Sequence, residues 1–341
     1  MRDLDIGIII VSYRSADLTV DCLRSLELEQ STPGLNIRTV VVDNDSGDFA
    51  PIAEFVRRNR WTEWISVVAA PRNGGFAYGN NLGIQSLVSN RPPDYIYLLN
   101  PDTKIRRGAI RTLVSFLETH PDVGIAGSSF ETADGVEWPI AFRFPSLVTE
   151  ICEGISWGII TRALGNRPCA RQMKMDRPEP VDWICGASMM IRPAVFDAIG
   201  GMDENYFLYY EETDFCHRAR LAGYPTWYVP ESRVMHIGGQ STKVTEQTPV
   251  PKPFPPYWFE SRRRYFAVTY GIRHAAIIDV TAILSLCIGS MKRFVLGRRN
   301  ESIPRFLRGL IRHSVLWPGN RDVAAVRSGV TPGWFRAPRT P

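Results

Sequence analysis

Several signatures are missing from this 341-residue sequence, and each absence removes a class of protein. The chain has neither a G-x-G-x-x-G run nor a Walker phosphate loop, so it fits neither a dinucleotide-dependent dehydrogenase nor a P-loop NTPase. Its six cysteines form no C-x-x-C pair, which argues against zinc and for a reducing compartment. No signal peptide is expected, because Asp3 and Asp5 precede an apolar run of only six residues.

The N-terminal half contains short apolar runs separated by helical patterns. The runs that we predict to be strands are residues 6–11, 40–42, 65–69 and 95–99. Helical spacing of apolar residues follows residue 15 and recurs at 50–59 and 79–88. Apolar strands that alternate with helices indicate a mostly parallel sheet covered on both faces. We therefore predict an α/β domain.

One carboxylate, Asp102, follows the run 95–99 directly, within Asn100-Pro101-Asp102. Ligands of open α/β sheets bind outside the carboxyl ends of the strands. A single acid in that place suits a hard divalent cation that carries a diphosphate, because Mg²⁺ binds one or two carboxylates together with phosphate oxygens. The alternative is that Asp102 only initiates a turn.

Two further loops have the composition of ligand-binding loops. Asp43 ends the second predicted strand, where its carboxylate either accepts from a nucleoside or closes an Asx turn. The pair Gly74-Gly75 permits close approach of the backbone to a ligand, and the helix expected near Gly79 directs its N-terminus at anions.

Three carboxylates, those of Glu211, Glu212 and Asp214, lie at the expected start of a helix that runs to about residue 221. Acidic residues favour the first turn of any helix through the macrodipole, which is one explanation of the cluster. The aromatic run 207–210 just before it instead suggests partial burial, which raises the pKa of a carboxyl group towards that of a useful general base.

The order of these motifs resembles that of the family 2 glycosyltransferases, and most closely their rhamnosyltransferase-like branch. The resemblance covers about residues 6 to 270. It rests on residues 8–13 (IIIVSY), 41–44 (VVDN), 73–77 (NGGFA), 99–102 (LNPD), 186–189 (GASM), 200–204 (GGMDE), 207–214 (FLYYEETD), 218–224 (RARLAGY) and 236–241 (HIGGQS).

The resemblance implies the GT-A fold of nucleotide-diphospho-sugar transferases, a Rossmann-like, mostly parallel sheet, and an inverting transfer that depends on Mg²⁺ or Mn²⁺. Asp102 corresponds to the last acid of the family's D-x-D metal motif, whose first position is here Asn100, and His236 corresponds to a histidine that reaches the metal or the diphosphate. The implied donor-binding residues are Ser12, Tyr13, Asp43, Asn73, Gly74, Gly75, Asn100 and Asp102.

An inverting transfer needs a general base within hydrogen-bond reach of the acceptor hydroxyl, opposite the leaving nucleotide. By the resemblance the second acid of the cluster is that base, which makes Glu212 the expected catalytic residue. Asp214 competes with it, because a Glu in place of the family's usual Asp reaches one methylene further. Glu211 is the third member of the predicted catalytic cluster.

Charge divides the chain into two parts. Residues 257–341 carry 15 Lys or Arg and 4 Asp or Glu, a net charge of +11, whereas the whole chain has +5. A basic region that also contains apolar runs favours an anionic membrane surface, and no nucleic-acid-binding module is recognisable. The apolar segment 275–291 contains Asp279 and is short for a spanning helix, so we expect an interfacial helix, with a buried core helix as the alternative.

We thus predict a GT-A catalytic domain at 1–248, with a nucleotide-sugar half at about 1–130 and an acceptor half at about 131–248. A Pro-rich loop at 249–256, a basic, membrane-associating helical region at 257–320 and a poorly ordered tail at 321–341 follow. No Gln is followed by the Gln-x-x-Arg-Trp pattern of the related processive synthases, which favours the addition of single sugars.

The predicted function is transfer of rhamnose from dTDP-rhamnose to a lipid-linked glycan in cell-envelope polysaccharide assembly. It places the protein in the cytoplasm, peripherally on the inner face of the cytoplasmic membrane. Three alternatives remain open from the sequence: the same chemistry with a UDP-hexose donor, a sugar-nucleotide pyrophosphorylase, and a non-catalytic protein that binds nucleotide-sugars.

Overall fold

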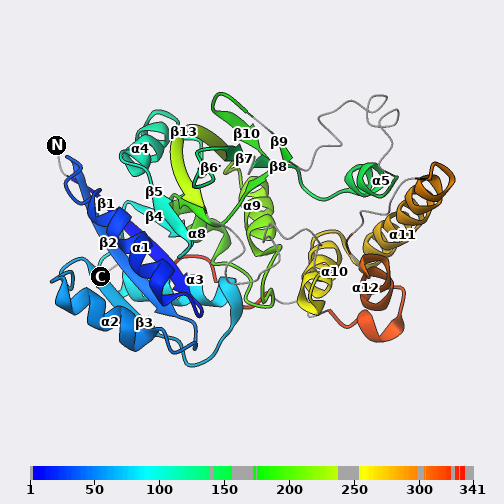
Figure 1. The fold of residues 1–341 in the computed structure, drawn as a ribbon, viewed down its shortest axis with the longest axis horizontal. Helices are drawn as coiled ribbons and strands as arrows, with labels where there is room; N and C mark the ends of the chain where they lie inside the picture. Colours follow the sequence, from blue (N-terminus) through cyan, green and yellow to red (C-terminus); the bar gives the residue numbers. More distant parts are fainter. Residues whose placement is uncertain are drawn as a thin grey trace.

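The computed structural model describes residues 3–138, 141–155, 172–173, 175–236, 253–297, 303, 305–323, 327–329 and 331–334. An α/β body contains most of the chain, and a group of C-terminal helices lies beside it (Figure 1). The first half of the body consists of β1 (Leu4–Ser12), α1 (Ala16–Glu27), β2 (Leu35–Asp43), α2 (Phe49–Arg58), β3 (Ile65–Ala69), α3 (Gly75–Asn90), β4 (Tyr95–Leu99), β5 (Thr103–Ile105), α4 (Ala109–Thr119) and β6 (Ile125–Glu131).

The elements that follow β6 include very short strands and a helix, α5 (Leu147–Ile155), that lies with the C-terminal helices (Figure 1). They are β7 (Glu137–Trp138), β8 (Ala141–Phe142), α5, β9 (Gln172–Met173), β10 (Glu179–Val181), β11 (Trp183–Ile184), β12 (Ser188–Ile191), α8 (Pro193–Ile199), α9 (Glu211–Leu221) and β13 (Thr226–His236). The C-terminal group consists of α10 (Pro256–Tyr270), α11 (Ile272–Val295), α12 (Phe306–His313) and a 3-10 turn at Pro318–Asn320.

The main sheet has the strand order β10-β13-β6-β12-β4-β1-β2-β3. Strands β4, β1, β2 and β3 are parallel, β12 is antiparallel to both of its neighbours, and β13 is parallel to β6. Strand β5 pairs antiparallel with the end of β13, in the register His236 to Thr103. This pairing brings the end of β13 next to the end of β4, although the two strands are far apart in the sequence.

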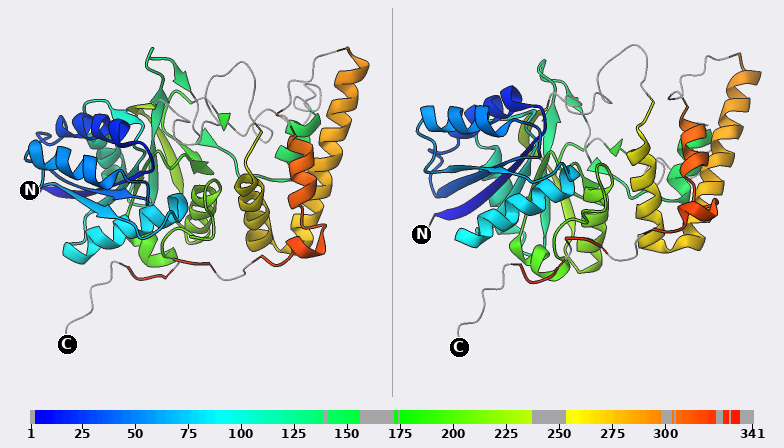
Figure 2. Two further views of the ribbon diagram at one scale, coloured as in Figure 1. Left: turned by 60° about the horizontal axis from the view of Figure 1, so that its bottom comes forward. Right: turned by 90° about the horizontal axis from the view of Figure 1, so that it is seen from below.

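The parallel strands are buried because helices cover both of their faces. Helices α1 and α2 lie on one side of the sheet and α3 on the other (Figure 2). On the α3 side, Gly79 and Gly83 let the helix approach closely, since a Cβ at either would lie 2.6 Å from Val11 or Ile9. All five residues of β4 are buried. The predicted strands 65–69 and 95–99 are β3 and β4, and the predicted α/β class is confirmed.

The C-terminal helices also follow the prediction of a helical region, and they pack through small and charged residues. Helix α11 packs on α5 so closely that a Cβ at Gly289 would lie 2.1 Å from the carbonyl oxygen of Gly154. Asp279, the one acid of α11, is buried, and it accepts from Arg262 of α10 at 2.6 Å and from Ser314 at 2.8 Å.

Two predicted boundaries fall partly outside the described residues. Of the Pro-rich loop, the structure describes only residues 253–256, which lead directly into α10. Within the expected poorly ordered tail, the described residues 327–329 and 331–334 return to the α/β body and make specific contacts there (Figure 2). Among the described cysteines Cys152 is disulfide-bonded, which the scattered spacing does not predict.

Candidate active site

A cavity of about 310 Å³ lies at the carboxyl ends of β1, β2 and β4. It is lined from one side by residues that follow these strands and from the other by the loop before α9 and the start of α10. The lining residues are Val11, Tyr13, Asn44, Asn73, Gly75, Phe76, Asn100, Pro101, Asp102, Cys185, Gly186, Ala187, Phe207, Leu208, Tyr209, Glu211, Glu212, His236 and Tyr257. Most of the predicted site residues therefore meet in one place.

Asp102 and His236 form a pair on the cavity wall. His236 Nε2 lies 3.1 Å from Asp102 Oδ1, and both residues are buried except for the part that faces the cavity. The antiparallel pairing of β5 with β13 creates this contact, because it places His236 opposite the residue that follows Asp102. Asn100 is held nearby by a bond from its backbone N–H to the carbonyl of Ala187, at 3.1 Å.

The pair suits a divalent cation that other groups help to bind. Within the described residues no three His, Cys, Asp or Glu side chains gather as a complete metal site. A carboxylate and an imidazole leave several positions of an octahedral ion for diphosphate oxygens and water, as Mg²⁺ and Mn²⁺ sites for nucleotides require. The chemistry of this donor set therefore fits the metal that the family implies.

The Gly74-Gly75 loop is fixed by amide side chains. Asn44 Nδ2 donates to Asn73 Oδ1 at 3.0 Å and to the carbonyl of Gly75 at 3.1 Å, while Gly74 N–H donates back to Asn44 Oδ1. Gly75 has φ +84°, and a Cβ there would lie 1.8 Å from the carbonyl oxygen of Phe207, so only glycine fits. Helix α3 begins at Gly75, four residues before the predicted start, and its N-terminus therefore lies at the cavity edge.

Two predicted donor residues have their side chains engaged inside the body. Asp43 accepts from Ser46 N–H, from the Ser46 hydroxyl and from Phe49 N–H at 2.6 to 3.0 Å. Ser12 is fully buried and donates to Asp48 at 2.7 Å. Neither lines the cavity, whereas Tyr13 does. Asp43 and Ser12 therefore hold the loops that follow β1 and β2.

Helix α9 places Glu211 and Glu212 on the cavity. Glu212 Oε2 has no hydrogen-bond partner in the described part of the chain. Burial raises the pKa of Glu212 to about 7. Burial and the neighbouring Glu212 charge raise the pKa of Glu211 well above its ordinary value.

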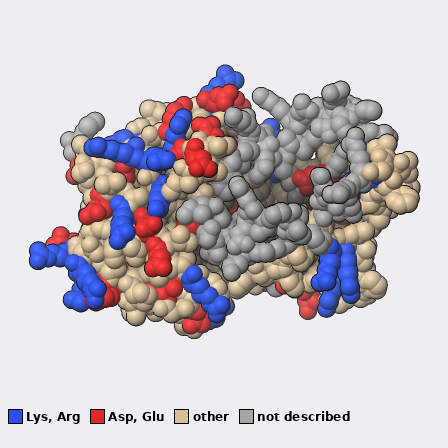
Figure 3. Space-filling model, viewed as in Figure 1, with Lys and Arg blue, Asp and Glu red and all other residues tan. Residues whose placement is uncertain are grey.

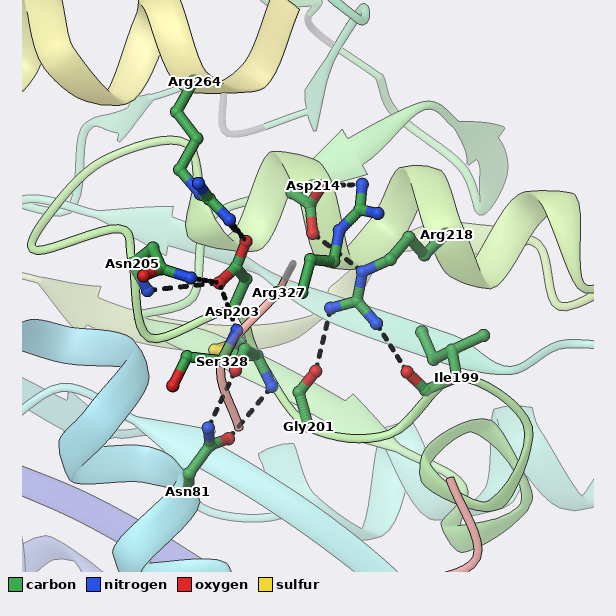
Figure 4. Close-up of polar contacts among 11 residues, drawn as sticks. Asn81, Ile199, Gly201, Asp203, Asn205, Asp214, Arg218, Arg264, Arg327 and Ser328 are labelled. Carbon is green, nitrogen blue, oxygen red and sulfur yellow. Dashed lines mark hydrogen bonds and ion pairs between the residues drawn. The ribbon is translucent and has the colours of Figure 1, made fainter. Parts of the chain in front are cut away.

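Asp214 lies on the other side of α9 and does not line the cavity. Its carboxylate is fully buried and pairs with Arg218 at 2.7 Å and with Arg327 at 3.0 Å (Figure 4). Both of its oxygens are thus bound to guanidinium groups. The three acids of the predicted catalytic cluster therefore differ in position. Two of them face the cavity, and the third pairs with arginines and holds the helix in place.

A second buried carboxylate, that of Asp203, holds the loop before α9. Arg264 of α10 donates to Asp203 Oδ2 from Nε at 3.0 Å and from Nη2 at 2.6 Å. Oδ1 accepts from Asn205 and from the backbone N–H of Ser328 (Figure 4). The loop, α10 and the C-terminal segment are therefore fastened together directly behind the cavity.

Several cavity residues were not expected from the sequence as site residues, and three of them show why. Asn44 directly follows Asp43, and its amide holds the glycine loop, although the sequence indicates only the neighbouring acid. Gly186 lines the cavity beside Glu212, which no local pattern signals. Tyr257 comes from α10, beyond the predicted catalytic domain, and only the tertiary packing of α10 brings it to the cavity.

Comparison with known proteins agrees with this geometry. The model of the family described as "Glycosyltransferase like family 2" matches residues 4–271. The N-acetylglucosaminyl-diphospho-decaprenol L-rhamnosyltransferase of Mycobacterium tuberculosis (strain H37Rv) is 27% identical over 248 residues, which are 69% of this chain and 76% of that protein. The rhamnosyltransferase WbbL of Escherichia coli (strain K12) is 26% identical over 234 residues, 67% of this chain and 82% of that protein.

A solved structure shares the fold. The mannosyltransferase PcManGT from Pyrobaculum calidifontis, determined in complex with GDP-Man and Mn²⁺, matches with a TM-score of 0.53 at 14% identity, over 92% of this chain and 79% of that one. Since the family model spans most of the sequence, and the sheet and its cavity have the corresponding form, this chain belongs to glycosyltransferase family 2 and is a glycosyltransferase.

Proposed function

We propose that the protein is an inverting, metal-dependent, non-processive glycosyltransferase that moves one rhamnose from dTDP-rhamnose to a lipid-linked glycan. The observation that carries the proposal is that one cavity holds both a metal-type pair, Asp102 and His236, and an unpartnered carboxylate oxygen of Glu212. Two relatives named as rhamnosyltransferases, one of them acting on a diphospho-decaprenol, support the donor and the acceptor class.

The chemistry follows from where the side chains lie. Glu212 takes the proton of the acceptor hydroxyl as that oxygen attacks the anomeric carbon, and the bond to the nucleoside diphosphate breaks in the same displacement. A bound Mg²⁺ or Mn²⁺ would neutralise the charge that develops on the diphosphate, held by Asp102 and His236. The backbone of the Gly74-Gly75 loop and the N-terminus of α3 add fixed dipoles on the same side.

Glu212 is the better candidate for the base than Asp214. An oxygen that has no partner is free to accept a proton, and a pKa near 7 matches the working pH. Asp214 is fully buried between two arginines. Removing it is therefore expected to affect folding as well as activity.

The donor is tested by measuring nucleoside diphosphate release from a panel of dTDP-rhamnose, UDP-glucose, UDP-galactose and UDP-N-acetylglucosamine, with Mn²⁺ and with EDTA. The acceptor is a short-chain N-acetylglucosaminyl-diphospho-lipid. If dTDP-rhamnose is the one donor in the panel that is turned over, the proposal is supported. If a UDP-hexose is turned over and dTDP-rhamnose is not, the UDP-hexose is the donor and the dTDP-rhamnose proposal is wrong. Membership of the glycosyltransferase family leaves no support for the pyrophosphorylase and the non-catalytic alternatives.

We also propose that α11 lies on an anionic membrane surface, at the inner face of the cytoplasmic membrane. Its large apolar residues point outward along one face at helical spacing: Ile277, Val280, Leu284, Ile288, Met291, Phe294 and Val295, each at least 41% exposed. The helix is long and apolar enough to cross a bilayer, but 33% of its most apolar stretch is buried against the rest of the protein. In Figure 3 acids and bases are interspersed over the α/β body.

Basic groups accompany the exposed face. Lys292 and Arg293 lie in the last turn of α11, and Arg308 and Arg312 line an open hollow of about 850 Å³ on α12 with Trp317. Helices that lie in a membrane interface combine an exposed apolar face with Lys and Arg, which bind anionic lipid head groups.

Flotation with phosphatidylglycerol vesicles at low salt tests this attachment. The double variant Leu284→Glu/Ile288→Glu should lose binding, and the matched control Leu28→Glu/Leu221→Glu, which changes exposed leucines of the α/β body, should retain it. Full-length protein that stays with the unbound fraction would contradict the membrane proposal.

A further inference from the structure

We propose that Phe207, Tyr209 and Tyr257 form an aromatic wall that binds the acceptor sugar, a pyranose with an apolar face. This inference rests on the proposed function and adds the acceptor subsite to it. The wall combines two residues of the loop before α9 with the second residue of α10, and all three line the cavity.

The wall lies on the side of the cavity where an acceptor must bind. Residues of the nucleotide side, such as Tyr13 and Asn73, follow β1 and β3, towards one edge of the sheet. Asp102 follows β4, a central strand, and the pairing of β5 with β13 brings His236 to it. The loop that carries Phe207 and Tyr209 leads directly into Glu211 and Glu212, so the wall adjoins the base that an acceptor hydroxyl has to reach.

The geometry of the rings suits a sugar. Tyr209 and Tyr257 are nearly parallel, with centroids 6.1 Å apart and an interplanar angle of 17°, and Phe207 is inclined to Tyr257 by 58° at 5.4 Å. An aromatic face carries partial negative charge, which attracts the polarised C–H groups on the apolar face of a pyranose. Phe207 is 40% exposed, so its ring is not required to fill the core.

The backbone of the loop is held in a costly conformation. Tyr209 and Tyr210 both have positive φ, at 70° and 69°. Each such residue costs on the order of 1–3 kcal/mol, and strain of this kind is retained mainly where a site needs it. The strain turns the chain between the wall and α9, and thereby places Tyr209 beside the two glutamates.

Two contacts join the loop before α9 to α10, and a third joins the loop to α3. Phe76 N–H donates to the carbonyl of Phe207 at 3.0 Å, and the hydroxyl of Ser261, in α10, donates to the carbonyl of Leu208 at 3.0 Å. The buried pair of Asp203 and Arg264 fastens the loop to α10 a second time. Tyr257 is therefore kept in a fixed relation to Phe207 and Tyr209.

The same arrangement accounts for an acceptor with a lipid attached. Helix α10 leads from Tyr257 into α11, whose apolar face is exposed. A saccharide bound on the wall would thus lie between the donor side of the cavity and the proposed membrane surface.

The test compares Tyr257→Ala, Tyr257→Phe and the control Tyr270→Ala, which removes a 40% exposed tyrosine at the end of the same helix. The probes are dTDP-rhamnose and the short-chain N-acetylglucosaminyl-diphospho-lipid. Tyr257→Ala should raise the KM for the acceptor up to about tenfold, as loss of an aromatic contact of about 1.4 kcal/mol requires, with the KM for the donor within about twofold. Tyr257→Phe, which keeps the ring, should restore the acceptor KM.

Saturation-transfer NMR with N-acetylglucosamine and dTDP separates this inference from the proposed function. Sugar signals that the wild type gives and Tyr257→Ala loses support the wall even where no turnover is seen, an outcome that would contradict the proposed function alone. Turnover with an unchanged acceptor KM in Tyr257→Ala, or an equal rise in the donor KM, would overturn the wall. Absence of both turnover and saturation transfer in the wild type would overturn both proposals.

Discussion

The α/β body and helix α11 differ in the residues that they bury and expose. In the body, Ile8, Val41 and Leu98 are fully buried, and polar residues lie at the strand ends. In α11, Asp279 and Ser285 are buried, whereas Ile288 and Met291 are exposed. A body of the first kind presents no apolar face that needs a cover. A helix of the second kind leaves apolar surface exposed, and the proposed membrane contact of α11 would cover it.

The two regions nevertheless share one site. Tyr257 reaches the cavity from α10, and Arg264 of the same helix neutralises the buried Asp203 behind it. The C-terminal helices therefore help to form the cavity wall, and α11 is also the proposed anchor.

The largest effect is expected at the base, in the body. Glu212→Gln keeps the size of the side chain but cannot accept a proton, so kcat should fall about 10²–10⁴-fold, the usual contribution of a general base. Donor binding, measured by titration with dTDP, should change little. A large loss in Asp214→Asn at unchanged unfolding free energy, together with full activity in Glu212→Gln, would exchange the roles of the two acids.

The next largest effect is expected at the strand end. Asp102→Asn removes the carboxylate next to His236, and kcat should fall about 10²–10³-fold, as for loss of one group that stabilises developing charge. EDTA should abolish wild-type turnover, and Mn²⁺ should restore it. The matched control Asp134→Asn changes an exposed acid far from the cavity lining and should be fully active. Undiminished turnover in excess EDTA would remove the metal from the account.

The connection between the two regions is tested by stability. Arg264→Met leaves the buried Asp203 carboxylate without its cation, and breaking a buried pair costs about 3–5 kcal/mol. Arg264→Lys should recover part of this. Urea unfolding measures the change, with Arg57→Met as the control for an exposed ion pair. An Arg264→Met variant as stable as the wild type would show that the helices do not support the body.

The smallest changes in unfolding free energy are expected at two neighbouring positions of α11, one on its buried face and one on its exposed face. Gly289→Ala pushes a methyl group against the carbonyl of Gly154, and such overpacking costs about 1–3 kcal/mol, reduced by the roughly 1 kcal/mol that alanine gains in helix propensity. Ile288→Ala trims an exposed side chain and should stay within about 0.5 kcal/mol of the wild type in urea unfolding. The reverse order would contradict the assignment of the buried face.

The sequence predicts the parts of the molecule that local rules determine. Short apolar runs identify β3 and β4, because a buried strand needs consecutive apolar residues. The acids at 211–214 mark the start of α9, because acidic side chains are favourable in the first turn of a helix. The contact of His236 with Asp102 depends on the pairing of β5 with β13, across 134 positions, and only the family resemblance suggested it. The place of Tyr257 in the cavity could not be predicted, because no residue near it in the sequence indicates where α10 packs.

The most direct test of the central claim, that Glu212 is the base of this cavity, is the pH dependence of kcat/KM. Burial raises the pKa of Glu212 to about 7, so below that pH the carboxyl is protonated and cannot accept the acceptor's proton. We expect the wild-type kcat/KM to fall about tenfold per pH unit below pH 7. The kcat/KM of Glu212→Gln should be low at every pH and should not show this dependence. A wild-type profile that is flat down to pH 5, or an unchanged profile in Glu212→Gln, would contradict the claim.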